Sequence, residues 1–187
     1  MSAQEWSEYN VGEDDSTILP IPHLWQNSPT ARKRRNDCMA ACAAMCIHGL
    51  TNERPTIDYI AERWQRTPNQ YMSFTDGGKI LRAYGLTGVH NNPWQKPLRA
   101  RGIAAAVEAG SPVIALVKYP KLPRQFVEFS GSHFIVVYGV DNGRLLYRDP
   151  LAASDETLDC SLETMDAALS GFVENENAPF QGMIVSR

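Results

Sequence analysis

Residues 36–48 read Asn-Asp-Cys-Met-Ala-Ala-Cys-Ala-Ala-Met-Cys-Ile-His, and the interpretation of the whole chain starts from this stretch. Asn36 or Asp37 can cap a helix whose body is small and apolar, which places Cys38 in the first turn. Unpaired backbone N–H groups and the positive end of the helix dipole meet at that turn, and both favour a thiolate. A helix end contributes at most about 2 kcal/mol, so a strongly activated Cys38 also needs an imidazolium partner.

The composition is that of one ordinary globular domain. The 187 residues carry a formal charge of −3 with a pI near 5.8, which argues against general binding to nucleic acid or to an anionic membrane. The apolar runs are too short to span a bilayer, and the acidic first residues do not resemble a signal peptide. We therefore expect a cytoplasmic protein with no nucleic-acid or membrane partner, built from a mobile arm (1–17) and one domain (18–187).

Three of the four cysteines share one face of the expected helix. Cys38, Cys42 and Cys46 follow at intervals of four residues, about 6 Å apart per step. This spacing does not suit a disulfide framework, so we expect reduced thiols, with Cys42 and Cys46 as packing residues. A metal site that added His48 would need all four ligands on one side, but His48 lies about 160° around the helix from Cys46. We expect no metal and no cofactor.

Hydrophobic periodicity predicts helices first and strands second. After the first helix, the predicted helices span residues 56–65, 76–84 and 99–109. The predicted strands span residues 113–117, 133–140 and 144–148, with an edge strand at 181–186. The fold class is therefore predicted to be α+β, with a helical lobe packed on an antiparallel sheet.

Two segments before the first helix have a distinctive composition. Residues 18–26 contain Pro20 and Pro22, so we expect an extended entry segment that ends at the side-chain amide of Gln26. Residues 32–35 read Arg-Lys-Arg-Arg. Four adjacent cations can contact phosphate, but we interpret them as a solvated loop before the helix.

Of the four histidines, His133 has the position that suits a general base for Cys38. It opens a strand after a Gly-Ser bend, so its ring can stand at the mouth of a cleft. The hairpin signal at Asn142-Gly143 then brings Asp149 back toward it. A carboxylate in that place can accept the Nδ1–H of the ring and support the imidazolium.

The length of the hairpin loop decides whether Asp149 can reach His133. A three-residue loop (141–143) would pair His133 with Leu151 and leave Asp149 diagonal to it on the same face, about 7–8 Å away. A two-residue turn at Asn142-Gly143 would put Asp149 on the other face. We predict the longer loop.

Taken together, four motifs resemble the papain-like cysteine peptidases, specifically the bacteriocin-processing, double-glycine-leader peptidases and their stand-alone bacterial and phage relatives. The motifs are Gln26, Asn36-Asp37-Cys38, residues 131–139 (Gly-Ser-His-Phe-Ile-Val-Val-Tyr-Gly) and residues 148–151 (Arg-Asp-Pro-Leu). The resemblance implies that Gln26 is the oxyanion donor, Cys38 the nucleophile, His133 the base and Asp149 the residue that orients it. The chain departs from the family pattern at Met39, which stands where members usually carry glycine.

We therefore predict a cysteine peptidase that cleaves a peptide or isopeptide bond of a protein or peptide substrate. The Cys38 thiolate would attack the carbonyl, while Gln26 and the Cys38 N–H hold the oxyanion. Met39, Ser132 and the loop at 119–132 are the candidate substrate contacts. The alternatives are an acyltransferase or deamidase on the same fold, a silent binding domain whose cleft Met39 blocks, and a cysteine-ligated metal protein.

Overall fold

A computed structural model describes residues 16–27, 36–64, 70–170 and 179–187. The basic run at 32–35 lies outside these ranges, as do residues 1–15 of the predicted arm. Thr17, at the end of that arm, pairs with Val140 in the sheet.

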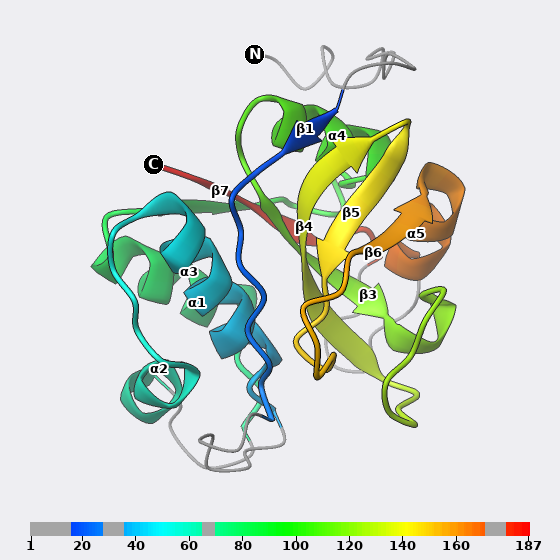
Figure 1. Ribbon diagram of the computed structural model, residues 1–187. Helices are drawn as coiled ribbons and strands as arrows, with labels where there is room; N and C mark the ends of the chain where they lie inside the picture. Colours follow the sequence, from blue (N-terminus) through cyan, green and yellow to red (C-terminus); the bar gives the residue numbers. More distant parts are fainter. Residues whose placement is uncertain (1–15, 28–35, 65–69, 171–178) are drawn as a thin grey trace.

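Helix α1 (Cys38–Leu50) forms the centre of the helical half of the molecule (Figure 1). Ten of its 13 residues are buried, and they lie on all sides of the helix. A helix that is hydrophobic all round packs inside a protein, and the many alanines let its neighbours approach closely. The other helices are α2 (Ile57–Trp64), α3 (Phe74–Ala83), α4 (Ala100–Glu108), α5 (Leu162–Leu169) and the 3₁₀ turn η1 (Tyr119–Lys121).

In the part of the chain that the structure describes, the strands form one antiparallel sheet of seven strands. Six of them follow the order β2-β7-β3-β4-β5-β6, and β1 pairs with β4. Their bounds are β1 (Thr17–Ile18), β2 (Thr87–His90), β3 (Val113–Lys118), β4 (Ser132–Asp141), β5 (Arg144–Arg148), β6 (Leu158–Ser161) and β7 (Gly182–Ser186). The α+β class predicted from the sequence is confirmed.

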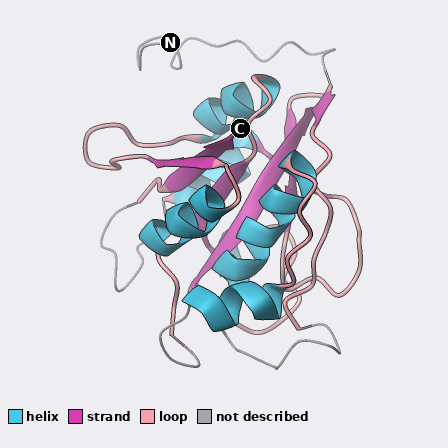
Figure 2. Cartoon of the chain, turned by 90° about the vertical axis from the view of Figure 1, so that its left-hand side faces the viewer, coloured by secondary structure: helices cyan, strands magenta, loops and turns pink. Residues whose placement is uncertain are grey.

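Helices cover both faces of the sheet, so there are two hydrophobic cores. One core joins the sheet to α1, α2 and α3, and the other joins it to α4 and α5. Strand β4 contributes alternately to both, with Phe134 and Val136 on the α1 side and Ile135 and Val137 on the other. Figure 2, seen from the side of α1–α3, shows these helices in front of the strands. The continuous apolar run in β3 follows from this double covering.

Several predicted boundaries differ from the structure. Helix α3 begins at Phe74 rather than at residue 76, because Ser73 caps it and forms a capping box with Asp76. Strand β7 is not an edge strand, since it lies between β2 and β3. Strands β2 and β6 and helix α5 are absent from the prediction.

Candidate active site

The hairpin between β4 and β5 ends in a two-residue turn. The strand register leaves only Asn142 and Gly143 in it. Their φ values of 48° and 72° are those of a type I′ turn, which matches the twist of paired strands. The predicted three-residue loop is therefore wrong. With this turn alone, Asp149 would lie on the opposite face from His133.

A β-bulge in β4 brings Asp149 to the same face of the sheet as His133. Strand β4 carries one extra residue, Tyr138, between the pair made by Gly139 and the pair made by Val137. One extra residue shifts the register by one and moves every later side chain of the partner strand to the other face. Continued to the end of the hairpin, the shifted register sets Asp149 on the same face as His133.

The segment from residue 18 to residue 26 is tied to this hairpin along its length. Near its start, the Leu19 N–H donates to the carbonyl of the bulged Tyr138 over 2.9 Å. At its end, the Gln26 N–H donates to the Pro150 carbonyl, also over 2.9 Å. No helix forms in the segment, as its prolines predict. These bonds bring Gln26 beside the end of the hairpin.

His133 and Asp149 form a buried hydrogen-bonded pair. The ring Nε2 of His133 lies 2.7 Å from Asp149 Oδ1, and the two side chains are 3% and 0% exposed. Asp149 Oδ1 also accepts from the Leu151 N–H at 2.8 Å. The sequence-based prediction that the carboxylate binds Nδ1 is wrong. The use of Nε2 leaves Nδ1 for a second partner.

Cys38 is that second partner of the ring. It is the first residue of α1 and is partly exposed, whereas the residues that follow it are buried. Burial by itself lowers the pKa of His133, but hydrogen bonds to Asp149 and Cys38, together with their negative charges, raise it to about 9. The ring is therefore an imidazolium at neutral pH, with a carboxylate on one side and a sulfur on the other.

The start of α1 keeps its first turn free of a side-chain cap. Asp37 occupies the N-cap position, but its side chain makes no capping hydrogen bond, contrary to one of the two predicted caps. The Asp37 side chain therefore does not occupy the backbone N–H groups around Cys38. Such a turn can donate hydrogen bonds to an anion.

Gln26 is a buried amide with unused hydrogen-bonding capacity. Its side chain is 3% exposed, and Oε1 receives no hydrogen bond from any residue that the structure describes. Buried polar groups are nearly always paired, and an unpaired one often marks a functional position. Its backbone bond to Pro150 holds it next to Asp149.

The model of the Peptidase_C39 like family matches residues 18–170. The chain belongs to this family. The resemblance predicted from the four motifs is confirmed at this level, and no curated protein matches the chain.

Two solved structures share the fold of this C39-like chain. One is described as a C39-like peptidase from Bacillus anthracis, with a TM-score of 0.61 and 14% identity over 93% of this chain and 98% of that one. The other is the peptidase domain of Streptococcus ComA, a bifunctional ABC transporter involved in a quorum-sensing pathway. It has a TM-score of 0.56 and 15% identity over 89% of this chain and 98% of that one. Family and fold together support a function of the cysteine peptidase type.

Met39, the departure from the C39-like pattern, does not line the cleft. Its side chain is fully buried between α1 and α3, and a Cβ at Gly77 would meet its sulfur at 2.6 Å. Residue 39 lies about 100° around the helix from Cys38, so it faces α3 while Cys38 faces His133. The prediction of Met39 as a substrate contact is therefore wrong. The alternative of a silent binding domain assumed that Met39 blocks the cleft, and the structure removes that assumption.

The other cysteines are buried. Burial raises the pKa of Cys42 and of Cys46 well above the usual range, and it raises the pKa of Cys160 to about 12. All four cysteines are free thiols. Cys42 and Cys46 lie in the core around α1, which confirms the prediction that they are packing residues.

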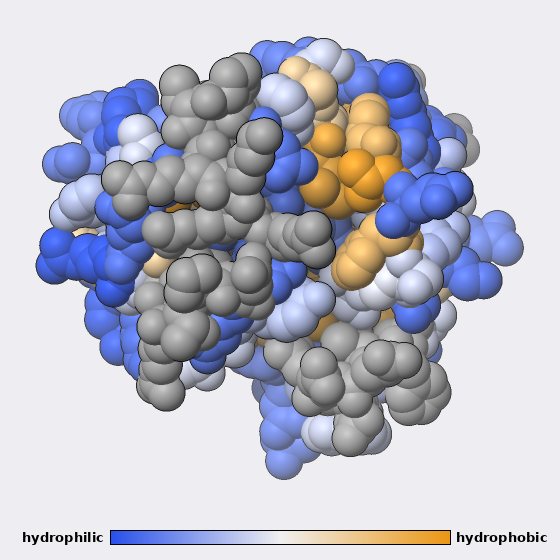
Figure 3. Space-filling model, turned by 90° about the horizontal axis from the view of Figure 1, so that it is seen from below, coloured by the Kyte–Doolittle hydropathy of each residue, from blue (hydrophilic) through white to orange (hydrophobic). Residues whose placement is uncertain are grey.

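The loop between β3 and β4 forms an open hollow of about 670 Å³. Its lining residues are Pro120, Gln125, Phe126, Val127, Glu128, Phe129 and Ser130. The loop reaches the lower end of the molecule in Figure 1, and Figure 3 shows hydrophobic side chains exposed at that end. Ser132, at the end of this loop, is partly exposed, and its contact with substrate stays a prediction.

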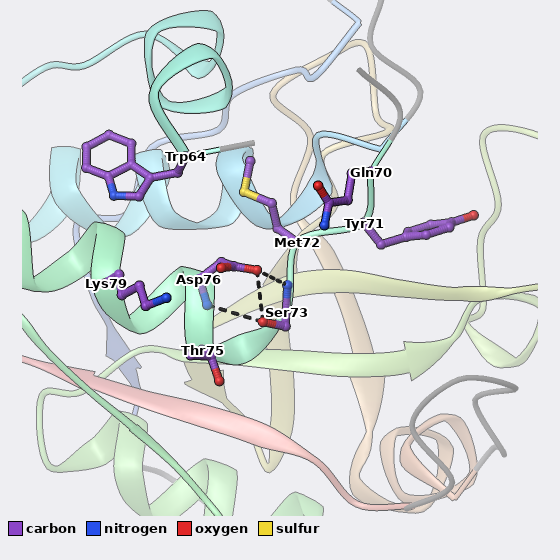
Figure 4. Close-up of a pocket in the computed structure, with 8 residues that line it drawn as sticks. All are labelled: Trp64, Gln70, Tyr71, Met72, Ser73, Thr75, Asp76 and Lys79. Atoms are coloured by element: carbon purple, nitrogen blue, oxygen red, sulfur yellow. Dashed lines mark hydrogen bonds between the residues drawn. The ribbon is translucent and has the colours of Figure 1, made fainter. Parts of the chain in front are cut away.

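A second hollow, of about 300 Å³, lies where the chain enters α3 (Figure 4). Trp64 and Tyr71 stand at its opposite ends, and the Ser73–Asp76 capping box lies between them. The remaining lining residues are Gln70, Met72, Thr75 and Lys79. The sequence signals above assign no function to these residues. Aromatic side chains just before a Ser-x-x-Asp cap are the signal that could have pointed to them.

Within the described ranges, no helix combines the length and apolarity needed to cross a membrane. In the same part of the chain, no three His, Cys, Asp or Glu side chains converge as metal ligands would.

Proposed function

We propose that this chain is a cysteine peptidase that cleaves an amide bond of a protein or peptide through Cys38, His133 and Asp149. The observation that carries the proposal is the His133 ring, buried and hydrogen-bonded to Asp149 through Nε2, with Cys38 as its other partner. A thiol at a helix start, an imidazolium and a buried carboxylate are the groups that activate a cysteine nucleophile.

Acylation starts with the Cys38 thiolate, which attacks the carbonyl carbon of the scissile amide. The C=O electron pair moves to oxygen, and the Cys38 N–H and the Gln26 side-chain amide hold this oxyanion. When the tetrahedral intermediate collapses, the C–N bond breaks. The leaving nitrogen takes the His133 Nδ1 proton and departs as an amine. Cys38 then carries the acyl group as a thioester, and His133 is neutral.

Deacylation reverses the proton flow. Neutral His133 removes a proton from a water molecule, whose oxygen attacks the thioester carbonyl. The C–S bond breaks, the carboxylic acid product leaves, and the thiolate–imidazolium pair returns. Asp149 keeps the ring oriented through its bond to Nε2.

The first test is the rate of Cys38 alkylation by iodoacetamide from about pH 4 to pH 9, in wild type and in His133→Ala. We expect wild type to react well below pH 7 and the variant to react only as a free thiol does, near pH 8.5. His48→Ala is the matched control, because its ring bonds the Pro55 carbonyl and lies outside the site. Equal pH profiles for wild type and His133→Ala would contradict the proposal.

The second test concerns hydrolysis itself. Wild type and Cys38→Ala would be incubated with a proteome-derived peptide library, and new termini identified by mass spectrometry. We expect cleavage by wild type alone, together with a mass adduct on Cys38 at short times. A reactive Cys38 with no new termini would contradict cleavage of main-chain peptide bonds and leave isopeptide cleavage, deamidation or acyl transfer to an amine.

A further inference from the structure

Tyr119 lies between the His133–Asp149 pair and the loop that carries the large hollow. Its side chain is fully buried, and its ring meets the His133 ring edge to face at 5.1 Å between centroids and 77° between planes. On the loop side, the same ring packs against Phe129 at 6.0 Å. Its backbone N–H donates to the Gly131 carbonyl at 3.1 Å. Tyr119 is thus in contact with the His133 ring and with the loop.

The hydroxyl of Tyr119 has a proton to donate. Its oxygen already accepts the Phe126 N–H at 2.8 Å, so the hydroxyl still has its own proton to place on an acceptor. Asp149 Oδ2 is a buried carboxylate oxygen that receives no hydrogen bond from the described residues. A buried acceptor without a partner costs free energy, and the Tyr119 hydroxyl is a donor that can supply one.

The ring contact places Tyr119 beside Asp149, because its ring lies 5.1 Å from the His133 ring and the His133 Nε2 lies 2.7 Å from Asp149 Oδ1. Burial raises the pKa of Tyr119, the Phe126 and Val127 N–H groups lower it, and Asp149 raises it further, both through its charge and as a hydrogen-bond acceptor. The other titratable groups around Asp149 are Cys42 from α1 and Tyr147 from β5, and Cys38 faces His133 from the helix start.

We propose that Tyr119 is a positioning residue of this site, whose hydroxyl donates to Asp149 Oδ2 and whose ring holds His133 edge-on. Its role in catalysis rests on the proposed function, whereas the contact itself does not. Held at both oxygens, the carboxylate cannot rotate away from His133 Nε2. The Phe126 bond also makes the hydroxyl sensitive to the loop, so a substrate seated in the hollow would act on the pair through Tyr119.

The test is an NMR titration of the His133 imidazole in wild type and Tyr119→Phe, which keeps the ring and removes the hydroxyl. We expect the midpoint of the His133 titration, about 9 in wild type, to fall by about one pH unit, because a carboxylate released at Oδ2 can rotate away from Nε2 and weaken the bond that raises the ring pKa. Tyr119→Leu should lower it further, because the edge contact also goes. Tyr84→Phe is the control, since Tyr84 packs on Trp64 at the core on the other side of the sheet.

An unchanged His133 midpoint in folded Tyr119→Phe overturns the proposal. A second measurement needs no variant. A hydroxyl bonded to a buried carboxylate gives a slowly exchanging downfield proton with a nuclear Overhauser effect to the His133 ring, and its absence from wild type also overturns the proposal. Neither readout uses a substrate, so failure of the proposed function would show separately, as Cys38 alkylation that does not depend on His133.

Discussion

The backbone N–H of Gln26 donates to the carbonyl of Pro150, the residue that follows Asp149, over 2.9 Å. This bond joins the entry segment to the end of the β4–β5 hairpin. Because it is made by the backbone, it holds Gln26 in place whatever its side chain does. The side chain can therefore be changed without releasing the segment.

Replacing Gln26 by methionine removes the amide and keeps the shape. If the amide holds the oxyanion, kcat should fall about 10²–10³-fold, as it does when one oxyanion donor is removed elsewhere. The alkylation rate of Cys38 should stay at its wild-type value, because no oxyanion forms in that reaction. Gln95→Met, at an exposed residue, is the control. Loss of both activities would instead indicate a structural role for Gln26.

Adding a methyl group at Gly77 should destabilise the fold through Met39. A Cβ there would stand 2.6 Å from the Met39 sulfur, closer than real contacts allow, so Gly77→Ala should cost about 1–3 kcal/mol of unfolding free energy. Gly78→Ala, one residue along the same helix, meets Met183 at an ordinary 3.6 Å and should instead stabilise by about 0.5–1 kcal/mol. Urea unfolding measures both. The idea of a tight α1–α3 contact fails if the two variants behave alike.

The charged His133 should make stability depend on pH in a defined direction. Its pKa is raised from 6.5 to about 9 in the folded state. The raised pKa stabilises the fold fully below about pH 6.5, and this contribution is lost as pH rises through about 9. We therefore expect the stability difference between wild type and His133→Ala to shrink steadily over that range. A difference that grows with pH would show that the ring is held neutral.

Deleting Tyr138 should leave His133 paired with Asp149. Tyr138 is the extra residue of the bulge, so without it Gly139 still pairs with Leu146 and Val137 with Tyr147, and Asp149 stays on the His133 face. The His133 midpoint should therefore stay near 9. Circular dichroism checks that the variant folds, and a midpoint that falls toward 6.5 would show that the shape of the bulge, and not the register alone, holds the pair.

The parts of the site that could be predicted from sequence have local signals. Cys38 is marked by its place at the start of a small-residue helix, and the hairpin is marked by Asn142-Gly143. The bulge at Tyr138 has no such signal, because it depends on how β4 pairs with β5 and with the segment at Leu19. The predicted face of Asp149 came out right from a wrong loop length, since the bulge supplies the same shift in register.

Other features depend on tertiary contacts that a linear pattern does not contain. Strand β7 is predicted at the edge of the sheet but pairs with β2, a short strand whose residues are mostly exposed. The direction of Met39 follows from the phase of α1, which is apolar on all sides and so offers no polar face to orient it. Tyr119 carries no sequence motif. Its importance lies in which groups the fold brings around its ring and hydroxyl.

The burial of α1 on all sides fixes the mobility of the site. The amides of its buried later turns should exchange with solvent only through global unfolding, so Cys38 is attached to one of the least mobile parts of the molecule. Beyond Tyr119, the surface that approaches His133 is a loop at 122–131 with mostly exposed side chains. The α1 side of the site is thus rigid, and the loop side is adaptable. Substrates of different shape would be accommodated by the loop, and selection for a new specificity could act on it without disturbing the core that holds the nucleophile.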